Sequence, residues 1–209
     1  MDIIEYQGAL YKTVEIGNQV WFSNNLRATM YANGDPIPMA EMLEIPGRRR
    51  GFLGEPLPGL IKGWKGGEGT RLTSNGYQLY NWHAIMDERG ICPKGWRIPS
   101  DDDWAELEVS LGMNSADTKT SGRANRGKGI GDILRRKWTD DGLVGFCAEG
   151  NSVVINRELR DYYDTRFWSS TSHETHKDEA WIRIINGEFI GRDIHNHDWG
   201  LPVRCVKDI

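Results

Sequence analysis

The 209-residue chain lacks any apolar run close to the roughly 18 residues of a membrane-spanning helix. It also lacks an excess of positive charge, because its formal net charge is −4, whereas nucleic-acid-binding surfaces are basic. We therefore expect neither membrane insertion nor a nucleic-acid partner. The segment Met1–Ala9 has neither the basic nor the apolar stretch of a secretory signal peptide, so we expect no classical leader.

Motifs for catalysis and metal binding are scarce as well. The sequence has no phosphate loop ending in GK[ST], no GxSxG elbow and no HExxH helix. His173 and His176 have HxxH spacing, and His195 and His197 have HxH spacing, which a zinc or nickel ion could use. No cysteine pair completes such a site, so we interpret these residues as loop histidines. We expect no catalytic residue, no bound metal and no cofactor.

Cysteine is rare, and its odd number limits the possible pairings. Cys92, Cys147 and Cys205 cannot all be paired within one chain. Cys92 and Cys205 both lie next to strand-like segments. We interpret these two as either a disulfide or a packed pair of thiols.

Glycine and tryptophan, in contrast, are abundant. The 25 glycines make up about 12% of the chain, against an average of about 7%, and they indicate many turns and close backbone approaches. The 9 tryptophans indicate a core or a binding face built from large flat side chains. This composition favours a compact, loop-rich fold over a helical bundle, and the length favours one domain over residues 1–209.

One helix and one hairpin have clear local signals in the first half of the chain. Alternating apolar residues on both sides of Gly17-Asn18 predict a hairpin within 3–22. Ser100 is a good N-cap, and the carboxylates of 101–103 suit the first turn of a helix that ends near Gly112. That position explains the acidic cluster without catalysis.

The remaining patterns indicate short strands and long loops. The region of about 34–76 is rich in glycine and proline and is expected to be an irregular insertion. Asn186-Gly187 is a strong hairpin signal. Residues 77–86 could form a short helix or a strand–turn, and residues 133–134 could open a short helix or strand. Together these patterns predict an α+β fold with two helices and with strands near 144–146, 153–155, 167–168, 180–185, 188–190 and 203–206.

Several segments, taken in order, resemble one family. They are 11–21, 24–27, 79–82, 92–100, 168–171, 180–181 and 203–206. The chain thereby resembles the Fibrobacter succinogenes major paralogous domain family, which is similar to the C-type lectin-like fold and more distantly to the formylglycine-generating sulfatase-modifying enzymes. The resemblance implies an α+β, C-type lectin-like fold of two helices, short twisted antiparallel strands and long irregular loops. The calcium-binding signatures of sugar-binding C-type lectins are absent.

The C-terminal part also resembles the lectin-fold targets of diversity-generating retroelements. In those proteins, fixed anchors bound a variable stretch, and here 168–171, 180–181 and 203–206 look like the anchors of a variable binding region over about 168–206. The resemblance implies ligand-binding roles for the residues between them: His173, His176, Asp178, Ile182, Ile184, Asn186, Arg192, Asp193, Ile194, His195, Asn196, His197, Asp198 and Trp199.

We therefore expect a non-enzymatic ligand- or receptor-binding module that displays a variable C-terminal face. The expected partner is a protein or a glycan on a cell surface, and the module could form a homo-oligomer. A phage tail tip or a bacterial cell surface would be its setting. The alternative is an enzyme, either metal-dependent through His195 and His197 or related to the sulfatase-modifying group.

Overall fold

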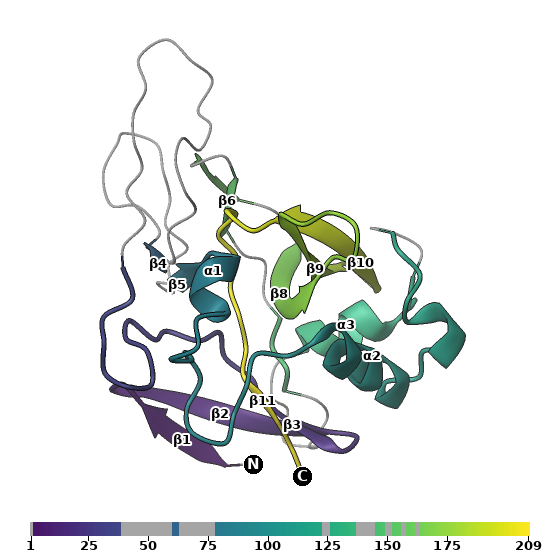
Figure 1. The fold of residues 1–209 in the computed structure, drawn as a ribbon. Helices are drawn as coiled ribbons and strands as arrows, with labels where there is room; N and C mark the ends of the chain where they lie inside the picture. Colours follow the sequence, from purple (N-terminus) through teal and green to yellow (C-terminus); the bar gives the residue numbers. More distant parts are fainter. Residues whose placement is uncertain are drawn as a thin grey trace.

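The computed structural model describes residues 2–38, 60–62, 78–122, 126–136, 145–148, 152–155, 158–161 and 164–209. The chain is α+β, as expected, with antiparallel strand pairs and few helices (Figure 1). In the part of the chain that the structure describes, no helix is long and apolar enough to cross a membrane.

Both ends of the chain lie on a first sheet (Figure 1). Its strands are β1 (Ile3–Tyr6), β2 (Ala9–Ile16), β3 (Gln19–Phe22) and β11 (Val206–Asp208), in the order β1-β2-β3-β11. The hairpin predicted within 3–22 is confirmed as β2–β3. The last strand starts later than the predicted 203–206, because the Val203 and Cys205 carbonyls accept hydrogen bonds from Leu26 and Phe22 before regular pairing begins.

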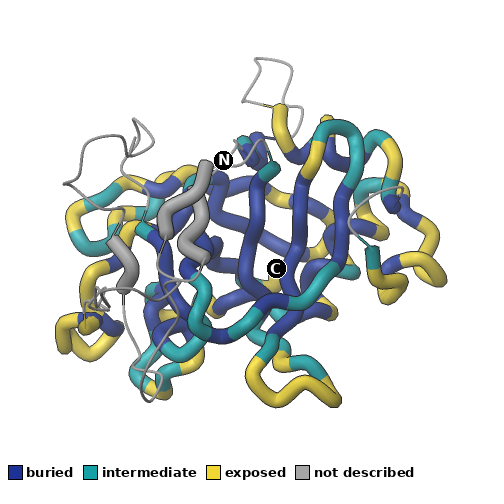
Figure 2. The backbone as a smooth tube through the Cα atoms, turned by 90° about the horizontal axis from the view of Figure 1, so that it is seen from above, coloured by how far each residue is buried: buried dark blue, intermediate teal, exposed yellow. Residues whose placement is uncertain are grey.

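The second sheet has three strands: β8 (Thr165–Ser172), β9 (Glu179–Asn186) and β10 (Phe189–Asn196), with β9 in the middle. The predicted hairpin at Asn186-Gly187 is confirmed, and Gly187 has a φ of 56°, a conformation that glycine adopts without strain. The strands of this sheet are buried along most of their length (Figure 2). They form the centre of the molecule and carry most of the predicted binding residues.

The described residues contain three α-helices and one 3-10 turn (Ser115–Asp117), where the sequence predicted two helices. Helix α2 (Asp101–Ser110) begins at the predicted N-cap Ser100, which forms a capping box with Asp103. Helix α3 (Ile130–Arg135) includes the segment near 133–134 that was left open between helix and strand. Helix α1 (Trp82–Ile85) is a single turn within 77–86, the segment that the sequence left open between a short helix and a strand–turn.

Two short strand pairs complete the described fold. Strand β4 (Leu60–Lys62) pairs with β5 (Gln78–Tyr80), so the predicted irregular insertion contains a strand; residues 39–59 and 63–76 lie outside the described residues. Strand β6 (Ser152–Ile155), which was predicted, pairs with β7 (Glu158–Asp161). Residues 145–146 are not the strand that was predicted there, since the Phe146 carbonyl accepts a hydrogen bond from the Arg204 side chain instead of from a strand. Residue 144 is not among the described residues.

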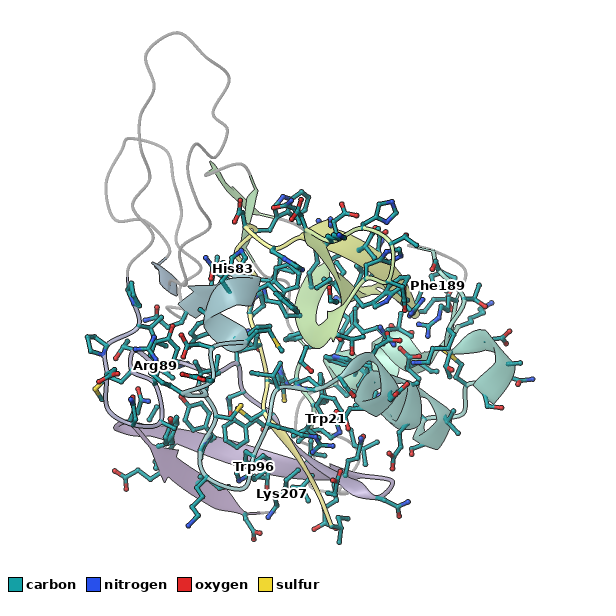
Figure 3. The ribbon with its side chains drawn as sticks, in the orientation of Figure 1. Trp21, His83, Arg89, Trp96, Phe189 and Lys207 are labelled. Carbon is teal, nitrogen blue, oxygen red and sulfur yellow. A yellow bond between two sulfur atoms is a disulfide. The ribbon has the colours of Figure 1, made fainter. Side chains whose placement is uncertain are left out.

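The core consists of two apolar clusters. One contains Tyr80, Trp168 and Ile182 together with the disulfide between Cys92 and Cys205. Of the two alternatives that the sequence left open for these cysteines, the structure has the disulfide. The other cluster contains Trp21, which lies against Trp104 of α2 with ring centroids 4.8 Å apart. Trp21 is labelled between the first sheet and α2 in Figure 3. Tryptophans thus build both clusters.

Candidate functional site

The structure buries five of the residues that the sequence assigned to a binding face. Ile182 and Ile184 are fully buried, because β9 is the central strand and both of its faces are covered. Arg192, His195 and His197 are also buried. This corrects the expectation that these five side chains are displayed on a surface.

Arg192 belongs to a buried network of ion pairs. Its Nε and Nη2 atoms each donate a 2.9 Å hydrogen bond to Asp101, and its guanidinium lies 3.2 Å from the centre of the Trp181 ring. Asp101 also accepts hydrogen bonds from Arg183 at 2.7 Å and Lys119 at 2.6 Å. Burial alone would raise the pKa of Asp101, but the hydrogen bond from Arg192 and the charge of Arg183 outweigh it and hold that pKa well below its usual range.

A second buried carboxylate, Glu108, extends this network along α2. Glu108 accepts hydrogen bonds from Arg183 Nε at 2.6 Å and from Arg126, whose Nη1 also donates to the Ile190 carbonyl. Burial lowers the pKa of Arg126, although the Glu108 carboxylate opposes this effect. The network ties α2 to β9 and β10. The acidic residues at the start of α2 therefore have a structural role in addition to the one expected from their position in the helix.

The two histidines of the HxH pair lie against different aromatic rings. The His195 ring is 3.9 Å from that of Trp199, and its Nε2 atom is 3.3 Å from Nη1 of Arg166. The His197 ring stacks on Trp82, with centroids 4.0 Å apart and planes inclined by 9°. Because each imidazole packs in its own aromatic contact, the spacing does not produce a shared metal site. Among the residues that the structure describes, no three His, Cys, Asp or Glu side chains are placed to hold a metal ion.

His197 has a further neighbour on α1. His83, labelled in Figure 3, lies edge-on to the His197 ring at 5.5 Å, and its Nε2 atom is 3.4 Å from the Asp198 carboxylate. Burial lowers the pKa of His197, and the neighbouring His83 lowers it further. The Nε2 atom of His197 is buried and has no hydrogen-bond partner among the residues that the structure describes. Burial against Trp82 therefore disfavours the protonated form of the His197 ring.

The other two histidines form the turn between β8 and β9. The rings of His173 and His176 are 4.6 Å apart, and His173 also contacts the Trp181 ring at 4.8 Å. His176 and Asp178 are exposed, whereas His173 is partly covered. Their separation of three residues allows both imidazoles to fold over the same turn.

All five histidines of the chain gather at one end of the second sheet. Glu179 at the start of β9 is paired with Asn196 at the end of β10, and the His197 amide donates a hydrogen bond to the Asp178 carbonyl. The Trp82 amide in turn donates to the His197 carbonyl, which brings α1 to the same end. We call this end the histidine rim and define it by His83, His173, His176, His195, His197 and the intervening side chains Trp82, Asp178, Asn196, Asp198 and Trp199.

The rim unites some predicted residues and separates others. Asp193 and Ile194 are half-buried on β10. Asn186 is exposed at the opposite end of β9, in the hairpin turn, and so lies away from the rim. The sequence reasoning missed Trp82 and His83, which are about 100 positions before the rest of the rim. The sequence holds one weak signal for His83. The other four histidines form the HxxH and HxH pairs, whereas His83 has no histidine near it in the sequence.

No curated protein and no solved structure matches the chain. The family model of the Fibrobacter succinogenes major domain matches residues 14–207. The matched region begins within β2 and ends within β11, and it includes the three-stranded second sheet, the three helices and the whole histidine rim. The chain therefore belongs to the Fibrobacter succinogenes major domain family.

Proposed function

We propose that the chain is a non-enzymatic binding module that contacts a protein or glycan of a cell surface through the exposed side of the histidine rim. The observation that carries the proposal is the gathering of imidazole, carboxylate, amide and indole groups on irregular segments at one end of a rigid sheet. Such segments, held by a fixed scaffold, are where proteins concentrate binding residues. The contacting side chains would be His173, His176, Asp178, Asn196, Asp198 and Trp199.

Buried side chains pack beneath the exposed residues of the histidine rim and hold them in place. Trp199 is half exposed and packs on the buried His195, and aromatic side chains contribute much of the energy of protein interfaces. The turn that carries His176 lies on Trp181, which is backed by Arg192 and the ion-pair network. A rigid base of this kind limits the ordering cost that a ligand must offset.

We further propose that the frame is C-type lectin-like and that variation, if a retroelement diversifies the chain, is confined to the rim. The pairing of the N-terminal strands with β11 and the separate three-stranded sheet support such a frame. Buried framework residues such as Ile182 and Arg192 leave little freedom for substitution. A phage tail tip or a bacterial surface is the proposed setting.

A binding screen against a glycan array and a panel of bacterial surface proteins tests the binding function. We expect the wild type to bind and Trp199→Ala and His176→Ala to bind about 30-fold more weakly, since an interface anchor contributes about 2 kcal/mol. Asn186→Ala is the matched control, because it removes an exposed polar side chain at the opposite end of β9. Binding that is lost in Asn186→Ala but retained in the rim variants would contradict the proposal, as would a wild type that binds nothing.

The gene provides a separate test of diversification. A diversified gene should be accompanied by a near-copy of its 3′ end and a reverse-transcriptase gene, with differences confined to adenines. We expect those differences in the codons of exposed rim residues such as His176 and Asp178. Differences concentrated in the codons of Ile182 and Ile184 would contradict the restriction to the rim.

A further inference from the structure

The hairpin of β1 and β2 is packed on one face only. Its inward side chains, such as Tyr11, pack on the core cluster that contains the Cys92–Cys205 disulfide. The side chains that alternate with them along both strands are exposed. We call the surface that these side chains form the outer face of the hairpin, and we define it by Ile3, Glu5, Leu10 and Lys12.

The two apolar side chains of the outer face lie on one diagonal. Ile3 is 59% exposed and Leu10 is 67% exposed. Ile3 is paired with Lys12 across the ladder, and Leu10 is paired with Glu5. Paired strands are about 5 Å apart and alternate residues are about 7 Å apart along a strand, so side chains on a diagonal can touch. The two residues therefore form one continuous apolar patch.

The other diagonal of the outer face carries one charge of each sign. Glu5 and Lys12 are both exposed and occupy the two remaining corners. In the part of the chain that the structure describes, neither charged group takes part in an ion pair or a side-chain hydrogen bond. The outer face thus combines an apolar diagonal with an acidic and a basic corner.

We propose that the outer face joins two copies of the chain in a two-fold symmetric dimer. A two-fold interface brings the same patch of both copies together and must be complementary to itself. An axis along the apolar diagonal places Ile3 and Leu10 on their own counterparts, and it places each Glu5 against Lys12 of the second copy. An axis along or across the strands would place charge on apolar side chains, and one along the charged diagonal would bring like charges together. The pattern is therefore self-complementary in one arrangement.

The position of the outer face leaves the histidine rim accessible in such a dimer. The inward side chains of the hairpin pack on the cluster that includes Ala84 and Ile85 of α1, so the outer face points away from α1. Figure 1 shows the hairpin at the lower edge of the molecule, with α1 and β9 above it. Dimerisation and the binding function proposed above therefore use different surfaces, and each can be tested without the other.

Sedimentation equilibrium of the full chain tests the interface. Four side chains are few beside the roughly 20–30 residues that each partner contributes to a standard interface, so we expect a weak, reversible dimer with a Kd of about 10–100 µM. Leu10→Ser should weaken dimerisation at least about tenfold, because the apolar contact is lost from both copies. Val109→Ser is the matched control, since it removes an exposed apolar side chain of α2 outside the outer face.

Exchanging the charges tests the arrangement of the two copies. Glu5→Lys and Lys12→Glu should each weaken dimerisation about tenfold, because each places like charges together at both ends of the interface. An equimolar mixture of these two variants should associate as strongly as the wild type, since opposite charges face each other again. The proposal would be overturned by a wild type that stays monomeric at concentrations about tenfold above the expected Kd. Equal weakening by Val109→Ser, or a mixture no stronger than either variant alone, would overturn it as well.

Discussion

Arg192 and Asp101 form a buried pair joined by two hydrogen bonds of 2.9 Å across 91 positions of sequence. The pair connects β10 to the first turn of α2, and its cation also lies against Trp181 beneath the histidine rim. Arginine is common in binding surfaces, but the guanidinium of Arg192 is buried and donates its hydrogen bonds to Asp101 inside the protein.

Breaking the Arg192–Asp101 pair should destabilise the protein. We expect Asp101→Ala to lower the free energy of unfolding by about 3–5 kcal/mol, because it leaves buried arginine charges without their partner. Urea denaturation measures the change. The adjacent Asp102→Ala is the control: its side chain is 90% exposed and should have little effect. Equal stability of the two variants would contradict a structural role for the network.

The same carboxylate should make the stability depend on acid. The pKa of Asp101 is depressed in the folded state, so its contribution is fully present above the unfolded value of about 3.9 and is lost as the pH falls further. We expect the urea midpoint of the wild type to decrease below about pH 4, and Asp101→Asn to show a smaller decrease. Parallel pH profiles for the two proteins would refute this assignment.

Reducing the Cys92–Cys205 disulfide should lower stability. The bond joins positions 113 residues apart, and loss of a native disulfide typically costs about 2–5 kcal/mol because the unfolded chain is less constrained. The double variant Cys92→Ser/Cys205→Ser should show this loss in urea denaturation without reductant. In Cys147→Ser, which removes the free cysteine, the disulfide is retained and no comparable loss is expected.

Gly131 is required by the contact between α3 and the β9–β10 hairpin. A Cβ atom there would lie 2.4 Å from the Gly187 carbonyl oxygen and 2.5 Å from that of Phe189, and backbone atoms cannot easily move aside. We expect Gly131→Ala to destabilise the protein by about 1–3 kcal/mol, measured by thermal or urea unfolding. Asp132→Ala, on the exposed side of the same helix, should be nearly neutral; a similar loss in both variants would argue against the close contact.

Local sequence signals predicted the elements whose bonds join residues close together in the chain. Ser100 indicated the start of α2 because an N-cap acts on amides two or three residues away. Asn186-Gly187 indicated the β9–β10 hairpin for a similar reason. The single turn of α1 was left open between a short helix and a strand–turn, and the pairing of β4 with β5 was missed, since neither is long enough to show periodicity.

The sequence by itself determined the family, the α+β class and the two local signals above, and it brought Cys92 and Cys205 together without deciding between a disulfide and a pair of thiols. Only the tertiary structure decided which side chains are exposed. Ile182 and Arg192 lie within the stretch expected to vary, yet the central position of β9 and the carboxylate of Asp101 bury them. His83 joins the other histidines because the Trp82 amide binds the His197 carbonyl. Burial and the rim both arise from contacts between residues far apart in the chain, and periodicity and spacing carry no information about such contacts.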